Sequence, residues 1–312
     1  QGATPNKSDK KPIIISTNTI SLQEQLIHRD IPFLNAVLPV EFSAVLVKGR
    51  SNYISLRRMN GAIDRAKTVF SQSEETEQLA QIAEWSQETG DGSKSDLRFR
   101  PLPKVWDEIQ SEHGNCLGKR CPTYDACYYY KARRRVWNAD ILVVNHALFF
   151  SDLALRREGA KVLPDYDVVI LDEAHSVEGV AGAHLGMTIS SGQFEYLLNK
   201  LYNDRTQKGL LVPHGLTAAQ KLVVHLRHVV GDFFDALKDW LRLHGSSNGR
   251  LRTPPDVINE VNGPLRELAG SIAVHAEKLK REEEKVELTA AANRCVALAD
   301  GLSNWLHQTM PD

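Results

Sequence analysis

The sequence has few cysteines, no long apolar run and no excess of charge of either sign. Four cysteines in 312 residues are too few for the disulfide framework of a small secreted domain. No apolar run approaches the roughly 18 residues of a membrane-spanning helix, and no signal-peptide pattern opens the sequence. The 38 Lys and Arg nearly balance the 39 Asp and Glu, so any attraction to nucleic acid must come from local patches. We therefore expect a cytoplasmic protein with no membrane partner.

The remaining composition is that of a globular protein. With 42% hydrophobic and 25% charged residues, the chain is neither collagen-like, disordered nor a coiled coil. Its first residue is Gln rather than Met, and residues 1–11 are polar and poor in helix formers. We expect this chain to be an internal piece of a longer protein.

Four short β-branched runs alternate with helical patterns in the first 175 residues. They are residues 12–17, 44–49, 141–146 and 167–175. This order is typical of an α/β fold with a parallel sheet of buried strands, in which ligands bind beyond the carboxyl ends of the strands. The sequence therefore predicts functional residues just after Ile15, Val47, Val144 and Leu171.

Charge is segregated between the second and third of these runs. Residues 71–91 carry six acids and no Lys or Arg, whereas residues 48–67 carry six basic residues and one acid, and residues 98–135 nine basic and four acidic residues. Both basic blocks contain aromatics, a combination that grips phosphates and stacks bases, although such blocks also form plain solvated surface. We expect these residues to contact nucleic acid: Lys48, Arg50, Tyr53, Arg57, Arg58, Arg133, Arg134 and Arg135.

From about residue 191 the apolar residues recur at helical spacing. They do so over residues 222–240, 258–279 and 288–305, which predicts an all-helical domain. Cys295 lies on one of these apolar faces, where we expect a buried structural thiol and not a metal ligand.

The sequence VVILDEAH is the strongest single motif. Its apolar strand runs directly into Asp172 and Glu173. Asp172 could hold Mg²⁺ through its oxygens, and Glu173 could orient and deprotonate a water for attack on a γ-phosphate of ATP. The alternative is a strand end with two solvated acids.

Together with its neighbours, this motif resembles the iron–sulfur branch of the DEAH-box superfamily 2 helicases, typified by DinG and XPD. ISTNTISLQEQLI is similar to the family's motif Ia, VKGRSNYISLRR to its K-G-R-x-N-Y-x-C segment, and CLGKRCPTYDACYYYKARRR to its cluster loop. ADILVVNHALFF and LPDYDVVILDEAH follow in the family's order. The resemblance covers residues 12–182 and implies a RecA-like first motor domain, followed by a helical arch.

Roles for individual residues follow from this resemblance. It implies that Asp172 binds Mg²⁺, that Glu173 activates water, and that His175 couples nucleotide state to the partner motor domain. Thr17 and Gln23 match motif Ia residues that contact a single DNA strand. Asn145 and His146 match the family's N-H pair at the edge of the third strand, and we expect them to bind DNA as well. The alternative role of Asn145, which does not exclude the first, is to cap the following helix.

The cysteines Cys116, Cys121 and Cys127 follow a C-x₄-C-x₅-C pattern in a loop with glycines and a proline. Such soft ligands select an iron–sulfur cluster or zinc. The resemblance implies a 4Fe-4S cluster, but Ser55 stands where the family has its first cluster cysteine. We expect a labile or incomplete cluster whose fourth ligand is Ser55, water or His113; the alternatives are zinc or no metal.

Two family elements are missing from these 312 residues. There is no G-x-x-x-x-G-K-[ST] phosphate loop, and the second motor domain with its S-A-T and Q-x-x-G-R elements is absent. We expect residues 1–50 and 140–190 to form an incomplete motor domain, residues 51–139 an iron–sulfur-type insertion and residues 191–312 the arch. This piece alone should not hydrolyse ATP.

For the whole protein the resemblance implies an ATP-dependent DNA helicase. It would move 5′ to 3′ on single-stranded and forked DNA, and no oligomer is expected. One alternative is an ATP-independent module that binds single-stranded DNA and has lost its motor loops. Another is a DinG-like nuclease, which would need an additional acidic exonuclease domain.

Overall fold

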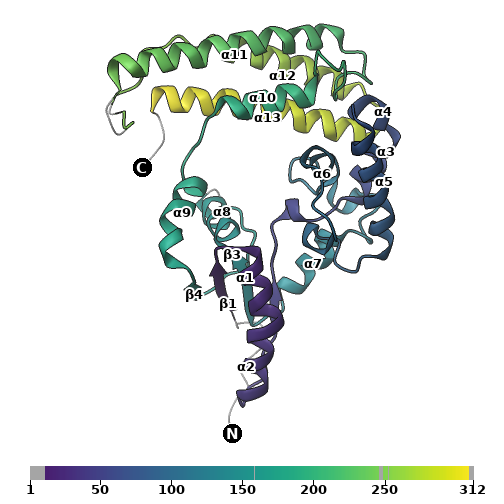
Figure 1. The fold of residues 1–312 in the computed structure, drawn as a ribbon, viewed down its shortest axis with the longest axis vertical. Coiled ribbons are helices and arrows are strands. Elements are labelled where there is room, and N and C mark those ends of the chain that lie inside the picture. Colours follow the sequence, from purple (N-terminus) through teal and green to yellow (C-terminus); the bar gives the residue numbers. More distant parts are fainter. Residues whose placement is uncertain (1–10, 158, 246–248, 252, 309–312) are drawn as a thin grey trace.

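The chain folds into a small parallel sheet, a helical insertion beside it and a layer of long helices above both (Figure 1). The structure, a computed structural model, describes residues 11–157, 159–245, 249–251 and 253–308. Residues 1–10 lie outside the described residues; they belong to the polar opening stretch and to the expected segment 1–50. Each of the three parts has its own hydrophobic core.

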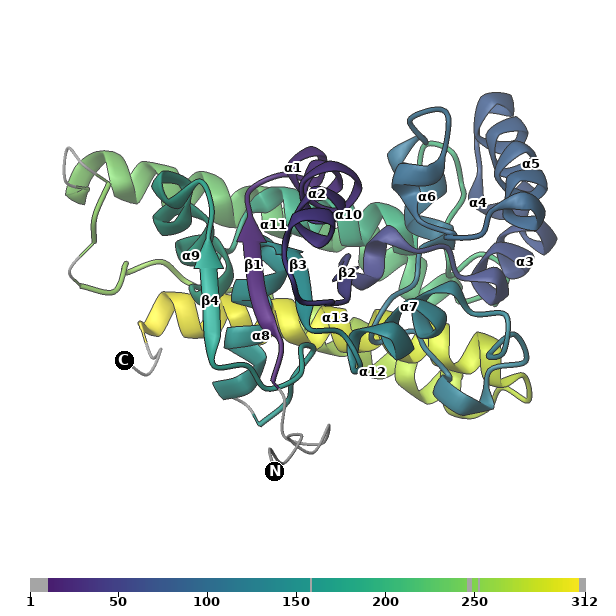
Figure 2. The same ribbon diagram turned by 90° about the horizontal axis from the view of Figure 1, so that it is seen from below.

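The four strands form one parallel sheet in the order β2-β3-β1-β4, visible in Figure 2. They are β1 (Ile13–Thr17), β2 (Ala44–Leu46), β3 (Ile141–Asn145) and β4 (Val168–Leu171). The helices of this part are α1 (Ile20–Gln25), α2 (Ile31–Val37), α8 (His146–Arg157) and α9 (Val177–Leu185), with α8 packed on α9. The predicted α/β class with a parallel sheet is confirmed.

The two edge strands depart from the prediction of four buried strands, and every residue of β2 is only half-buried. The side chains of β1 and β3 include Ile14 and Leu142 with no exposed surface, but in β4 Val168 and Ile170 are about half exposed. The cause is position, because β4 lies at the edge of the sheet and pairs only with β1 among the described residues. The apolar run of β4 therefore identified a strand correctly but did not place it inside the sheet.

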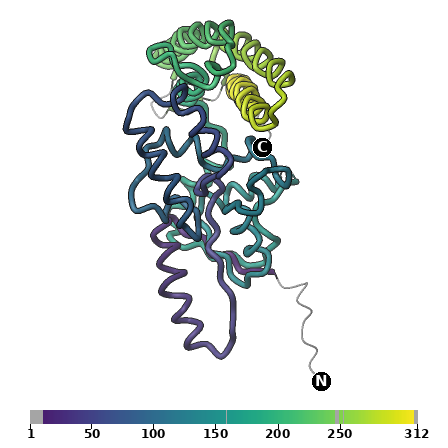
Figure 3. The backbone as a smooth tube through the Cα atoms, turned by 90° about the vertical axis from the view of Figure 1, so that its right-hand side faces the viewer, coloured from purple at the N-terminus to yellow at the C-terminus, as the bar shows by residue number. Residues whose placement is uncertain are grey.

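A hairpin-like segment around α2 projects from the sheet (Figure 3). Several of its apolar side chains are exposed, with Phe33 at 66% and Val40 at 59%. The segment begins with the π-helical turn η1 (Leu26–Asp30), which joins α1 to α2.

The insertion between β2 and β3 is a compact group of helices. It contains α3 (Leu56–Asp64), α4 (Ala66–Val69), α5 (Ser73–Glu88), α6 (Pro103–Ile109) and α7 (Tyr128–Val136). Short 3₁₀ turns occur at η2 (Arg50–Asn52), η3 (Lys94–Asp96) and η4 (Gly118–Arg120) here, and at η5 (Ala174–Ser176) after β4. Its core gathers Ile54, Phe70, Ile82 and Trp106, so the charged blocks of the sequence surround an apolar centre.

Gly92 makes this insertion sensitive to a single methyl group. Its φ is +64°, and an added Cβ would lie 2.1 Å from Cγ of the Tyr128 ring. The Tyr128 hydroxyl donates to the Ser86 carbonyl at 2.7 Å, which holds the ring in place. We expect Gly92→Ala to lower the free energy of unfolding by about 2 to 4 kcal/mol, from left-handed backbone strain plus overpacking.

Gly90→Ala is the matched control for this prediction. A Cβ at Gly90 meets nothing within 4 Å. Its effect should stay within about 1 kcal/mol in urea unfolding followed by tryptophan fluorescence. Equal unfolding midpoints for the two variants would contradict the prediction, because they would show that the Tyr128 ring moves to make room for the methyl group.

The C-terminal part is helical, as its periodicity predicts. It consists of α10 (Ser191–Leu201), α11 (Thr217–His244), α12 (Asn262–Glu277) and α13 (Glu282–His307). The helical pattern predicted over residues 258–279 is wrong at its first residue, because Ile258 precedes α12 and is 81% exposed. Cys295 is fully buried on α13, as expected, and burial raises the pKa of its thiol to about 12. Among the described residues, no helix is both long and apolar enough to cross a membrane.

Candidate functional site

The carboxyl ends of three strands meet at one edge of the sheet. Thr17 at the end of β1 is opposite Asn145 at the end of β3, and Ser16 is opposite Leu171 at the end of β4. The backbone amide of Asp172 donates to the Ser16 carbonyl at 2.8 Å. The parallel register therefore brings Thr17, Asn145 and Asp172 together, although Thr17 and Asp172 are more than 150 residues apart in the sequence.

The acidic residues after β4 are open to solvent. Asp172, Glu173 and His175 are all exposed, and His175 Nδ1 lies 3.3 Å from Glu173 Oε2. The amide and the hydroxyl of Ser176 both donate to the Glu173 carbonyl at 2.9 Å. The edge thus presents two adjacent accessible carboxylates, a donor set that suits a hydrated Mg²⁺ ion.

Glu173 has a left-handed backbone, with φ 51° and ψ 44°. This conformation is uncommon for residues other than glycine and costs on the order of 1 to 2 kcal/mol. It lies between the end of β4 and η5, so the chain turns sharply at the acidic pair. Such local strain persists only where surrounding contacts impose it.

Asn145 and His146 have separate roles in the structure. Asn145 Oδ1 accepts the amide of Leu148 at 2.9 Å, so the predicted cap of the following helix is confirmed. His146 is fully buried, and its ring lies between the Ser16 hydroxyl and the Asp172 carbonyl. A side chain so placed presents no surface to DNA in this conformation.

Thr17 and Gln23 are also buried, with 0% and 1% of their surface exposed. Among the described residues, neither Thr17 Oγ1 nor Gln23 Nε2 has a hydrogen-bond partner. A buried polar atom without a partner destabilises the fold by about 1 to 3 kcal/mol. Their expected contact with DNA would require this edge to open, because both side chains are buried here.

The first basic block is largely committed to internal contacts. Arg57 donates to the Asn115 carbonyl at 2.9 Å and to its Oδ1 at 2.7 Å, and Arg58 donates to the Gln110 and Asp107 carbonyls. Both arginines are less than 10% exposed. These contacts hold α3 against α6 and the cysteine loop. Contact of the two arginines with phosphate stays a prediction.

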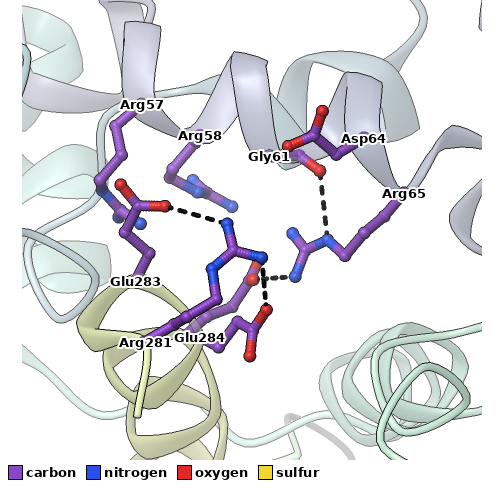
Figure 4. Close-up of a pocket in the computed structure, with 9 residues that line it drawn as sticks. Arg57, Arg58, Gly61, Asp64, Arg65, Arg281, Glu283 and Glu284 are labelled. Atoms are coloured by element: carbon purple, nitrogen blue, oxygen red, sulfur yellow. Dashed lines mark hydrogen bonds and ion pairs between the residues drawn. The ribbon is translucent and has the colours of Figure 1, made fainter.

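Figure 4 shows where these arginines point. Arg57, Arg58 and Arg65 line a small pocket whose opposite wall is Arg281 and the glutamates at the start of α13. Arg65 pairs with Glu287, and Arg281 pairs with Glu284 at 2.8 Å. The pocket is therefore a charged contact between the insertion and the helical layer, and none of the expected catalytic residues lines it.

Lys48, Arg50 and Tyr53 are likewise engaged. Lys48 Nζ donates to Ser93 Oγ at 2.9 Å and Ser95 Oγ at 2.6 Å, and the Arg50 guanidinium lies 4.0 Å from the centroid of the Tyr129 ring. Tyr53 is only 3% exposed. These three residues support the insertion from within, and only part of Lys48 and Arg50 reaches the surface.

The second basic block is more open. Arg134 and Arg135 on α7 are exposed, while Arg133 is half-buried with its guanidinium 5.8 Å from the Trp137 ring centroid. Lys131 is also exposed and lies three and four positions before these arginines, so all three share one face of α7. Lys131 was not among the residues predicted from the sequence to bind DNA. Its helical spacing from Arg134 and Arg135 is the signal that could have identified it.

The three loop cysteines line one small cavity of about 20 Å³. Ser55 and Ser111 line the same cavity, and Ser55 also caps α3 by accepting the Arg58 amide at 3.4 Å. No disulfide joins the three cysteines, which are half-buried. Over the described residues, no three His, Cys, Asp or Glu side chains are already arranged to hold a metal ion. The cavity supplies three soft donors and a hydroxyl, but their side chains do not yet converge.

The environments of the thiols differ. Burial raises the pKa of Cys116, but the Gly118 amide, Arg50 and Tyr130 outweigh it and lower the pKa below its usual value. The Gly118 amide lies 3.4 Å from Cys116 Sγ. Burial dominates at Cys127 and raises the pKa of that thiol. Cys116 is therefore the cysteine of this pair that more readily becomes a thiolate.

Comparison with known proteins identifies similar chains. The family model DEAD_2 matches residues 107–194, which include the cysteine loop and the acidic pair. ATP-dependent DNA helicase YoaA of Haemophilus influenzae is 32% identical over 244 residues, covering 76% of this chain and 38% of that protein. YoaA of Escherichia coli is 36% identical over 190 residues, covering 59% of this chain and 29% of that protein.

Other relatives carry the name DinG. The Bacillus subtilis protein named 3′-5′ exonuclease DinG is 26% identical over 241 residues, which cover 76% of this chain and 24% of that protein. A solved structure named truncated XPD aligns over 95% of this chain and 76% of its own, at 12% identity and a TM-score of 0.36, which does not establish a common fold. The chain thus spans between 24% and 38% of the length of these curated relatives.

Proposed function

We propose that the whole protein is an ATP-dependent DNA helicase, because this chain belongs to the DinG/XPD-like superfamily 2 helicases. One observation carries the proposal. The parallel sheet delivers Asp172 and Glu173, exposed and adjacent, to the same edge as Thr17 and Asn145. Ligand sites of open parallel sheets lie at this edge.

The roles in ATP hydrolysis follow from the chemistry of this edge. Asp172 would hold Mg²⁺, Glu173 would position and deprotonate the attacking water, and His175, within 3.3 Å of Glu173, would transmit nucleotide state. Because these 312 residues contain no phosphate loop, the chain by itself should not turn over ATP. Translocation on single-stranded and forked DNA, with 5′ to 3′ polarity, belongs to the same proposal.

A strand-displacement assay on the whole protein tests the proposal. We expect ATP-dependent separation of a duplex with a 5′ single-stranded tail and little separation with a 3′ tail. The competing function is DNA binding without ATP hydrolysis by a chain that has lost its motor loops. Tight DNA binding with no DNA-stimulated release of phosphate would favour that second function.

We also propose that the cysteine loop holds an iron–sulfur cluster through Cys116, Cys121 and Cys127. The donor chemistry fits, because three thiols share one cavity and one of them has a lowered pKa. Ser55 lines the same cavity and stands where the resemblance implies the fourth ligand. A hydroxyl binds iron poorly, so the cluster would be labile. When bound, the cluster would cross-link the loop to the start of α7.

Substituting Ser55 by Cys should raise iron occupancy after anaerobic reconstitution and slow the loss of visible absorbance in air. The fourth thiolate completes the soft ligand set that such clusters use. Ser111→Cys is the control, because Ser111 lines the same cavity. If Ser111→Cys stabilises the cluster and Ser55→Cys does not, Ser55 is not at the fourth position.

A further inference from the structure

We propose that His146 is a positioning residue that holds the backbone of Asp172 and Glu173 in the conformation that keeps both carboxylates at the sheet edge. The proposal rests on the catalytic roles proposed above for Asp172 and Glu173. His146 has no exposed surface and bridges β1 and the end of β4 from the first turn of α8. It therefore touches neither solvent nor the carboxylates, and acts through the peptide group between them.

The hydrogen bonds of the ring fix its tautomer. His146 Nε2 lies 2.9 Å from the Asp172 carbonyl oxygen, which can only accept, so Nε2 must carry a proton and donate. Nδ1 lies 2.7 Å from Ser16 Oγ. When Nε2 alone carries the ring proton, Nδ1 accepts from the Ser16 hydroxyl. Ser16 thereby keeps the Nε2 proton pointed at the Asp172 carbonyl.

The carbonyl that His146 binds belongs to the peptide that precedes Glu173. The orientation of this peptide plane sets φ of Glu173, which is +51°. On the other side, Asp172 N is tied to the Ser16 carbonyl, and the Glu173 carbonyl accepts from Ser176. His146 supplies the contact that holds the plane between these two anchors, so the strained turn keeps both carboxylates at the sheet edge.

The ring also links three sequence segments that ATP and DNA are expected to use. Ser16 precedes Thr17 of motif Ia, His146 follows Asn145, and Asp172 opens the acidic motif. A shift of β1 against α8 would move the ring and tilt the Asp172–Glu173 peptide.

The test compares three variants of the whole protein. His146→Leu removes the donor and should lower kcat for DNA-stimulated ATP hydrolysis by about 10- to 100-fold, the usual cost of losing a partner that orients a metal-binding group. KM for ATP should change little, because the carboxylates themselves remain. His146→Gln places an amide nitrogen near the position of Nε2 and should recover most of kcat.

Ser151→Ala is the matched control. Ser151 Oγ lies 3.1 Å from His184 Nδ1, a similar serine–histidine pair on α8 and α9 that does not involve the Asp172 carbonyl. Its kcat should equal that of the wild type. Unchanged kcat in His146→Leu would overturn the proposal if Glu173→Gln abolishes turnover. If Glu173→Gln leaves turnover intact, the proposed function fails instead.

A measurement on the unmodified chain tests the geometry without any variant. Nitrogen-15 NMR of the His side chains should show a proton on Nε2 of His146. An Nδ1–H tautomer would overturn the proposal, because its Nε2 could not donate to the Asp172 carbonyl.

Discussion

Replacing Glu173 by Gln in the whole protein is expected to reduce DNA-stimulated ATP hydrolysis by roughly 100- to 10,000-fold, the range attributed to general-base catalysis. Gln has nearly the same shape as Glu but cannot take a proton from the attacking water. Glu173 is exposed at the carboxyl edge of the sheet and belongs to the expected Mg²⁺ site. Binding of ATP and Mg²⁺ should persist, since Asp172 remains, so the loss should appear in kcat.

The measurement is phosphate release with and without single-stranded DNA, beside nucleotide binding by fluorescence. Glu178→Gln is the matched control, because Glu178 is an exposed acid in the first turn of α9, five residues further along. That variant should retain wild-type turnover. If Glu173→Gln hydrolysed ATP at the wild-type rate, another base would have to be sought and the assignment of the acidic pair would be wrong.

The strands and the long helices could be predicted because their signals are local. Runs such as IIIST and ILVVN carry their own β preference, and α11 and α13 show their apolar periodicity directly. The exposed face of β4 could not be predicted in this way. The composition of a strand indicates that it pairs, but its place in the sheet depends on which strands lie beside it.

The basic residues show where sequence patterns lose information. Arg57 and Arg58 belong to a basic block, yet the fold turns them toward the carbonyls of Asn115, Gln110 and Asp107, some 50 residues away. A count of charges does not say which way a side chain points. Arg134 and Arg135, in a helix with a short apolar face, do lie at the surface.

The contact between Ser16 and His146 is also beyond sequence patterns. The two residues are 130 positions apart, and only the β1–β3 register brings them together. A signal was present, because Ser16 is a polar residue inside an otherwise apolar strand. That signal indicates a buried hydrogen bond without naming its partner.

Binding of single-stranded DNA by this chain should be indifferent to base sequence and should weaken steeply with salt. Contacts of Lys and Arg with phosphates release counterions, and affinity for single strands falls by about 0.7 log units per log unit of salt for each phosphate neutralised. Four such contacts, including those from the exposed face of α7, would lower affinity roughly 50-fold between 50 and 200 mM salt. Aromatic stacking would add affinity without sequence preference.

Replacing Lys131, Arg134 and Arg135 together by Gln should weaken binding at low salt and reduce the salt slope by about 2, because three phosphate contacts are lost. The matched control changes Lys221, Lys238 and Lys278 to Gln, which alters net charge equally at exposed positions of the helical layer. Affinity is measured by fluorescence anisotropy with several oligonucleotides across a salt series. A salt slope that falls equally in both variants would mean that overall charge, rather than the α7 face, attracts DNA. A strong preference for one base sequence would contradict phosphate contact as the main source of affinity.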